Sequence, residues 1–130
     1  MAFEIPVPYT WNSTFSVEYK NLDNEHRGLF KAIADCEQNR KCGDTLDRLR
    51  KVMKDHFDTE EEMMLKANYA QDLFEPHKVA HDDFIEKLSG LEATEEKPLS
   101  DDDVIYVKQW LVDHIKGTDF KYKGQLSESE

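Results

Sequence analysis

Apolar residues recur in alternating steps of three and four positions along four stretches of this chain. The stripes contain Leu22, Leu29, Ile33 and Cys36; Leu49, Met53 and Met63; Phe74, Phe84 and Leu88; and Val104, Val107 and Leu111. This spacing is typical of amphipathic helices, which bury one face and expose the other. Four such stripes predict an all-α fold, an up-down-up-down four-helix bundle.

Residues 19–117 contain the four helices of the expected bundle. The helices are expected at Tyr19–Gln38, at Asp44–Lys66, from about Gln71 to Leu88, and from Ser100 to Gly117. Asp44 and Ser100 are predicted N-caps, because a side-chain oxygen there accepts a hydrogen bond from the first turn of the helix. The Ser89–Ser100 segment contains glycine, proline and acidic residues, so it is predicted to be a loop.

Residues 1–18 and 118–130 lie outside the helical pattern. The first segment has Pro6, Pro8 and several aromatic residues without helical spacing. We expect it to be an extended arm whose aromatic side chains cover one end of the bundle. Residues 118–130 form a C-terminal segment with a polar tail, Ser127–Glu130, expected to be disordered. The whole chain, residues 1–130, is expected to be a single domain, because its length suits one core.

Charge and composition exclude several classes of function. A net charge of −11 disfavours binding to nucleic acid and to anionic membranes, which both require a basic face. The same charge favours a monomer that repels its own copies. No stretch approaches the ~20 apolar residues of a membrane span, and Met1–Thr10 lacks the apolar core of a signal peptide. With only Cys36 and Cys42, both expected to be free thiols, the sequence predicts a cytoplasmic protein.

All five histidines occupy stripe positions that would ordinarily hold apolar side chains. They are His26, His56, His77, His81 and His114, and Glu60 shares the stripe of His56. Residues i and i+4 project from one helix face, so His56/Glu60 and His77/His81 are chelating pairs. Each buried polar group without a partner costs roughly 1–3 kcal/mol, whereas a whole domain is stable by only about 5–15 kcal/mol. A metal centre inside the bundle would satisfy all of these groups together.

Asp119 is the expected second carboxylate of this centre. It lies five residues after His114, and on a regular α-helix that spacing points the two side chains in different directions. Gly117 lies between them and is expected to let the chain leave the helix, which would bring Asp119 back to the site.

The ligand count indicates a pair of metal ions with one open position. Two octahedral ions, bound by five imidazoles, two bridging carboxylates and one bridging oxide or hydroxide, keep a single coordination position free. His77, His81 and His114 would saturate one ion, and His26 and His56 would bind the other. Glu60 and Asp119 would bridge the two ions. One open position on a paired redox metal suits end-on binding of O2.

The chemistry of the ligands favours an O2-binding protein over an enzyme. Carboxylate-rich di-iron bundles use Glu-x-x-His motifs, and no histidine here has a glutamate three residues before it. Neutral imidazoles stabilise reduced iron and disfavour oxygenase or ferroxidase chemistry. Trp110, Leu111 and Ile115 flank His114 and are predicted to form a dry O2 pocket. That stretch offers no obvious general acid or base.

Several motifs match one known family over nearly the whole chain. They are the stretch from Pro6 to Trp11, Asn24-Glu25-His26, His56-Phe57-x-x-Glu60, His77-x-x-x-His81, and the stretch from His114 to Gly124. With these motifs the chain resembles the hemerythrins, and most closely their monomeric invertebrate branch, the myohemerythrins. The resemblance implies a four-helix bundle, two oxo- or hydroxo-bridged iron ions at the seven residues above, and reversible binding of O2 as a hydroperoxide at the five-coordinate iron.

Two alternatives to O2 storage or transport remain open at this point. A di-iron enzyme of the peroxidase type would use the same open position, although no proton-delivering residue is evident. A metal-sequestration or defence protein would bind other metals on its acidic surface and thiols, although two cysteines are few for that role. Trp11 and Tyr122 are interpreted as packing aromatics, and Glu61 and Glu62 as part of a solvated face.

Overall fold

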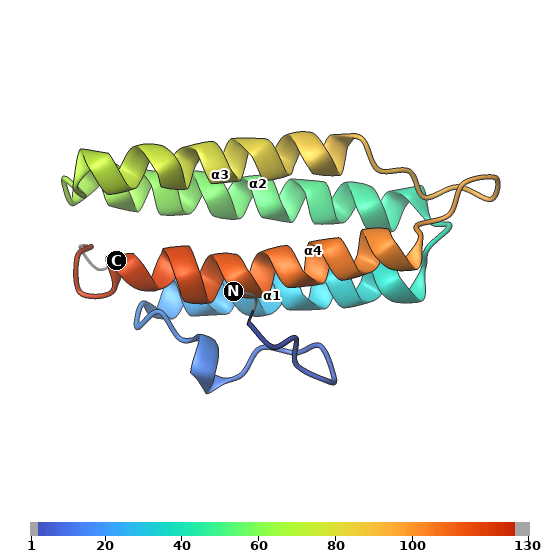
Figure 1. Cartoon of the computed structure of the whole chain (residues 1–130), viewed down its shortest axis with the longest axis horizontal. Helices are drawn as coiled ribbons and strands as arrows, with labels where there is room; N and C mark the ends of the chain where they lie inside the picture. The colour runs from blue at the N-terminus through green and yellow to red at the C-terminus, as the bar shows by residue number, and fades with distance from the viewer. Residues whose placement is uncertain (1–2, 127–130) are drawn as a thin grey trace.

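Four antiparallel helices form the body of the protein in a computed structural model, which describes residues 3–126. The helices are α1 (Lys20–Gln38), α2 (Gly43–Lys66), α3 (Gln71–Ser89) and α4 (Asp101–Asp113). Figure 1 shows each helix running opposite to the one before it, with α2 beside α3 and α1 beside α4. Residues 3–126 contain no strand. The predicted all-α, up-down-up-down four-helix bundle is therefore confirmed.

The two predicted N-caps have different outcomes. Ser100 caps α4 as predicted: its hydroxyl accepts from the Asp103 N–H, and the Asp103 carboxylate accepts from the Ser100 N–H. The prediction for Asp44 is wrong, because α2 begins one residue earlier and Cys42 is its N-cap. Asp44 lies in the first turn instead, where its negative charge interacts favourably with the N-terminal end of the helix dipole.

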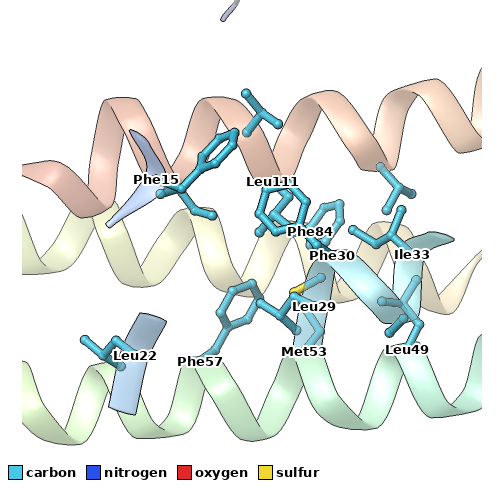
Figure 2. Packing of buried hydrophobic residues seen from close by; sticks show 14 of the residues in the cluster. Phe15, Leu22, Leu29, Phe30, Ile33, Leu49, Met53, Phe57, Phe84 and Leu111 are labelled. Carbon is cyan, nitrogen blue, oxygen red and sulfur yellow. The ribbon is translucent and has the colours of Figure 1, made fainter. Parts of the chain in front are cut away.

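The apolar core fills the bundle beside and beyond the histidines. Figure 2 shows side chains from all four helices meeting between the ribbons. The buried stripe residues include Leu22, Leu29, Ile33, Leu49, Met53, Phe84, Leu88, Val104, Val107 and Leu111. At the end of the bundle where α1 meets α2, the interior is almost wholly apolar and is lined by residues such as Ile33, Leu46 and Leu49. The polar cluster is thus confined to the part of the bundle nearer the start of α1.

The N-terminal arm runs along the flank of the bundle. Figure 1 shows it lying beside α1 and α4 rather than across one end, so the expected position of the arm is wrong. Within residues 3–18 its one regular element is a short 3-10 turn, Ser13–Phe15. The rings of Tyr9 and Phe15 lie 4.7 and 4.9 Å from the ring of Phe30 on α1, and the Tyr9 hydroxyl donates to the Lys108 carbonyl on α4. These contacts hold the arm against α1 and α4.

The segment after α4 folds back onto α1. The Tyr19 hydroxyl on the α1 side donates to the Leu126 carbonyl and accepts from the Leu126 N–H. Residues 127–130, for which a disordered tail was expected, lie outside the described residues. Within residues 3–126, no helix combines the length and apolarity required to cross a bilayer.

Candidate metal centre

All seven residues expected to bind metal meet inside the bundle. His26 comes from α1, His56 and Glu60 from α2, His77 and His81 from α3, and His114 and Asp119 from the segment after α4. Each of the seven is buried, and none is more than 6% exposed. Their donor atoms fall into two overlapping groups that share Glu60 and Asp119.

The first group contains two histidines and one oxygen from each carboxylate. The Nε2 atom of His26 lies 3.2 Å from Asp119 Oδ2 and 3.6 Å from Glu60 Oε2. The Nε2 atom of His56 lies 3.3 Å from the same Glu60 oxygen. Four donor atoms therefore converge between α1 and α2.

The second group contains three histidines and the other oxygen of each carboxylate. The Nε2 atoms of His77 and His114 lie 3.0 and 3.1 Å from Asp119 Oδ1. The Nε2 atom of His81 lies 3.1 Å from Glu60 Oε1. Each carboxylate thus presents one oxygen to each group, which is the geometry of a bridge between two ions.

The contacts within the cluster fit ions better than hydrogen bonds. The buried atoms without a hydrogen-bond partner in the described part of the chain include both ring nitrogens of His26, Glu60 Oε1, His77 Nε2 and both carboxylate oxygens of Asp119. Ligands bind first-row metals at about 2.0–2.2 Å, so two ligands at right angles lie about 3 Å apart. The observed separations of 3.0–3.6 Å match donors that point at a common centre. This donor set is therefore suited to two metal ions.

A π-helical turn brings Asp119 to the site. The sequence analysis expected the chain to leave the helix at Gly117, and this expectation is wrong. The chain instead widens into a π-helix over His114–Thr118 and continues as a 3-10 helix, Asp119–Tyr122. The Asp119 N–H donates to the His114 carbonyl, a bond that spans five residues and places the two side chains one turn apart on the same face. Gly117 needs no glycine-only backbone conformation, since its φ is not positive.

Three polar residues around the cluster were missed by the sequence analysis. Glu25 on α1 contacts the Nδ1 of His56 at 2.7 Å, and Glu61 on α2 contacts the Nδ1 of His81 at 2.9 Å. Tyr122, interpreted as a packing aromatic, donates from its hydroxyl to Glu60 Oε2 at 2.6 Å. Glu61, assigned to a solvated face, is largely buried, with 17% of its side chain exposed.

Before a metal ion binds, the cluster carries both signs of charge. Burial lowers the pKa of His56, but attraction to Glu60 and hydrogen bonds to Glu25 and Glu60 outweigh it and raise the pKa to about 10. In the same way, contacts with Asp119 and Glu60 outweigh burial and raise the pKa of His77 to about 9. Burial raises the pKa of Glu60, but His56 and His26 hold it well below its usual value. Metal ions must therefore displace protons from the imidazoles.

The directions of these pKa shifts determine how the stability of the metal-free chain depends on pH. The protonated imidazoles of His56 and His77 stabilise the fold fully below their unfolded value of 6.5, and this contribution is lost as the pH rises through about 9 to 10. Glu60 acts in the opposite direction. Its lowered pKa stabilises the fold above its unfolded value of 4.5, and that contribution is lost in acid.

Comparison with known proteins agrees with this geometry. Residues 17–126 match the family model described as the hemerythrin HHE cation binding domain. The chain belongs to the hemerythrin family. The myohemerythrin of Theromyzon tessulatum is 52% identical over 126 residues, which cover 97% of this chain and 100% of that relative. The myohemerythrin of Riftia pachyptila is 49% identical with the same coverage.

Solved structures support the same assignment. A crystal structure of wild-type hemerythrin is similar to this chain with a TM-score of 0.79 and 27% identity, covering 89% of this chain and 95% of that one. The resemblance to hemerythrins seen in the sequence motifs is thus confirmed, and so is the fold that it implied.

The predicted O2 pocket residues occupy two different environments of this hemerythrin domain. Leu111 and Ile115 are buried, at 1% and 0% exposure. Trp110 is only partly buried, and its ring stacks on His114 at 4.4 Å, on the three-histidine side of the cluster. Phe57 was not singled out by the sequence analysis, yet its ring stacks on His81 at 3.8 Å and lies 5.9 Å from His56. It therefore contacts histidines of both groups.

Proposed function

We propose that this protein binds O2 reversibly at a pair of iron ions. His26 and His56 would hold one ion, and His77, His81 and His114 would hold the other, with Glu60 and Asp119 offering one oxygen to each. When bound as ferrous iron, such a pair would supply the reversible two-electron chemistry that O2 binding requires. The group with His26 and His56 offers one protein ligand fewer than the other, so the open position would lie there.

One observation carries this proposal. The two oxygens of Glu60 face different histidine groups, at 3.3 Å from His56 and 3.1 Å from His81, and those of Asp119 divide in the same way. Each group therefore receives one oxygen from each carboxylate, but one group has two histidines and the other has three. Membership of the hemerythrin family and the burial of the whole cluster support the same assignment.

The surroundings of the cluster support a carrier rather than an enzyme. Glu25 and Tyr122, two titratable residues beside the two-histidine group, are both hydrogen-bonded to ligands, so neither is a free proton donor. Leu111 and Ile115, both buried, are proposed to wall the O2 pocket. Apolar walls would slow autoxidation of the centre, because the protons and anions that drive it must cross a region of low dielectric to reach the bound O2.

The test combines metal analysis with an optical titration. The purified protein should contain two irons per chain, and its visible absorption should appear in air and disappear under argon over repeated cycles. His81→Ala should lose iron and the optical change together. A zinc-only protein, or one with a single metal, would contradict the assignment of two irons. Irreversible oxidation with sustained turnover of peroxide would assign the protein to the peroxidase-type alternative.

We further propose that the protein is a cytoplasmic monomer. Its net charge of −11 opposes self-association, and both of its cysteines are unpaired thiols, the state maintained in the cytosol. Sedimentation should give a mass near 15.3 kDa at all protein concentrations. A stable octamer would contradict the proposed monomer.

A further inference from the structure

We propose that Glu25 and Glu61 are positioning residues, each of which orients one histidine of one of the two metal sites. This inference rests on the proposed pair of metal ions but not on O2 binding. Each glutamate reaches across to the next helix: Glu25 of α1 contacts His56 of α2, and Glu61 of α2 contacts His81 of α3. His56 belongs to the two-histidine group and His81 to the three-histidine group.

The contacts determine which imidazole nitrogen faces the metal. An ionised carboxylate only accepts hydrogen bonds, so the Nδ1 atoms of His56 and His81 must carry the proton and donate it. Each ring then presents the free lone pair of Nε2 to the cluster. A carboxylate on the outer nitrogen also raises the basicity of the imidazole, and the loss of such partners weakens metal binding by 10–100-fold in typical cases.

The positions of the two glutamates in sequence explain why they reach neighbouring helices. Glu25 precedes His26, and Glu61 follows Glu60. One helical step rotates a side chain by about 100°, so the residue next to an inward ligand points sideways towards the adjacent helix. Each of these glutamates therefore lies beside a ligand of its own helix and bonds to a ligand of the next.

Both glutamates lie in surface grooves that also supply matched controls. Glu25 lines a groove of about 230 Å³ between α1 and α2, together with His56 and Asp55. Asp55 pairs with Lys51 instead of a histidine. Glu61 lines a groove of about 220 Å³ between α2 and α3, together with Asp58, which pairs with Lys54. Replacing either aspartate removes the same charge from the same groove without touching a histidine.

The first test measures retention of zinc, which needs no redox chemistry. The zinc-loaded protein is titrated with a chelator, and the two ions are counted as they leave. Glu25→Ala and Glu61→Ala should each lower the zinc affinity of one of the two sites about 10–100-fold. The zinc affinity of the other site should stay close to that of wild type. Asp55→Asn and Asp58→Asn should leave both ions unchanged.

The conservative variants separate orientation of the ring from the effect of charge. Glu25→Gln and Glu61→Gln keep an oxygen that accepts from Nδ1 but lose the negative charge. They should therefore retain zinc better than the alanine variants and less well than wild type. Equal retention in the alanine, glutamine and aspartate-control variants would overturn the proposal.

A second measurement reports on the rings directly. In nitrogen-15 NMR spectra of the zinc-loaded protein, the Nδ1 protons of His56 and His81 should be visible and should exchange slowly with water. Glu25→Ala should speed exchange at His56 alone, and Glu61→Ala at His81 alone. Unchanged exchange in both variants would overturn the proposal even if the protein binds O2. Retention of these zinc properties in a protein that never binds O2 would refute only the proposed function.

Discussion

The hydrogen bond from Tyr122 to Glu60 gives a sharp test of how the bridging carboxylate is held. The Tyr122 hydroxyl is fully buried and donates at 2.6 Å to the oxygen that faces His26 and His56. Burial, together with the charges of Asp119 and Glu60, holds the pKa of Tyr122 well above its ordinary value, so the hydroxyl remains a donor at every ordinary pH. Tyr122→Phe removes this single donor and keeps the ring.

The expected loss follows from the charge on the acceptor. A hydrogen bond to a charged group contributes about 1.5–3 kcal/mol, whereas a neutral one contributes about 0.5–1.5 kcal/mol. Tyr9 is the matched control, because its side chain is also buried but its hydroxyl donates to the neutral carbonyl of Lys108. Tyr122→Phe should therefore cost about 1 kcal/mol more than Tyr9→Phe. At this chain length each kcal/mol corresponds to roughly 4 °C in the melting temperature.

Urea unfolding of the iron-loaded protein, followed by circular dichroism, measures both variants under identical conditions. The midpoints should fall in the order wild type, Tyr9→Phe, Tyr122→Phe, with equal slopes. Iron analysis should show the larger loss of metal in Tyr122→Phe. If that variant is no less stable than Tyr9→Phe, the hydroxyl does not hold the bridge and Tyr122 is only a packing aromatic.

Four further predictions concern the pocket, the helical register and the pH dependence. Leu111→Ala should keep both irons but shorten the lifetime of the O2-bound form, followed by its visible absorption in air; an unchanged lifetime would exclude Leu111 from the pocket wall. Gly117→Ala should be tolerated, because the added Cβ lies 3.7 Å from the nearest atom, in ordinary contact. Deletion of Thr118 should remove the π-helical turn and abolish metal binding in elemental analysis. The metal-free protein should lose stability towards urea as the pH rises from 6.5 to about 10, because folded His56 and His77 keep their protons up to higher pH than the unfolded chain does. Metal affinity should rise over the same range, and a flat stability profile would contradict the assigned charges.

The sequence predicted the helices and six of the seven members of the buried cluster from helical periodicity, whereas Asp119 was expected only because the centre required a second carboxylate. His26, His56 and Glu60 occupy positions of an apolar stripe, and burial follows directly from that placement. Periodicity also shows why the return of Asp119 was misread. Counting at 3.6 residues per turn cannot represent a turn that spans five residues.

The residues around the cluster could not be found from the stripes. Glu25 and Glu61 lie one step beside inward-facing ligands, where a surface carboxylate is also expected. Their role depends on the distance between helices, which a single helical pattern does not contain. The path of the arm could not be predicted for the same reason. Tyr9 and Phe15 pack on Phe30, a contact between residues without a shared period.

The wide spacing of the cluster along the chain has a consequence for how the protein acquires its metal. His26 and Asp119 are separated by 93 positions, and Asp119 follows every helix of the bundle. Because chains are synthesised from the N-terminus, a nascent chain displays the ligands of α1, α2 and α3 before either ion has its full complement. Such an incomplete set binds whichever divalent ion holds imidazole most strongly, and copper and zinc exceed ferrous iron in that order. Loading with the proposed iron would therefore depend on metal availability during the interval between synthesis of α3 and docking of the segment after α4.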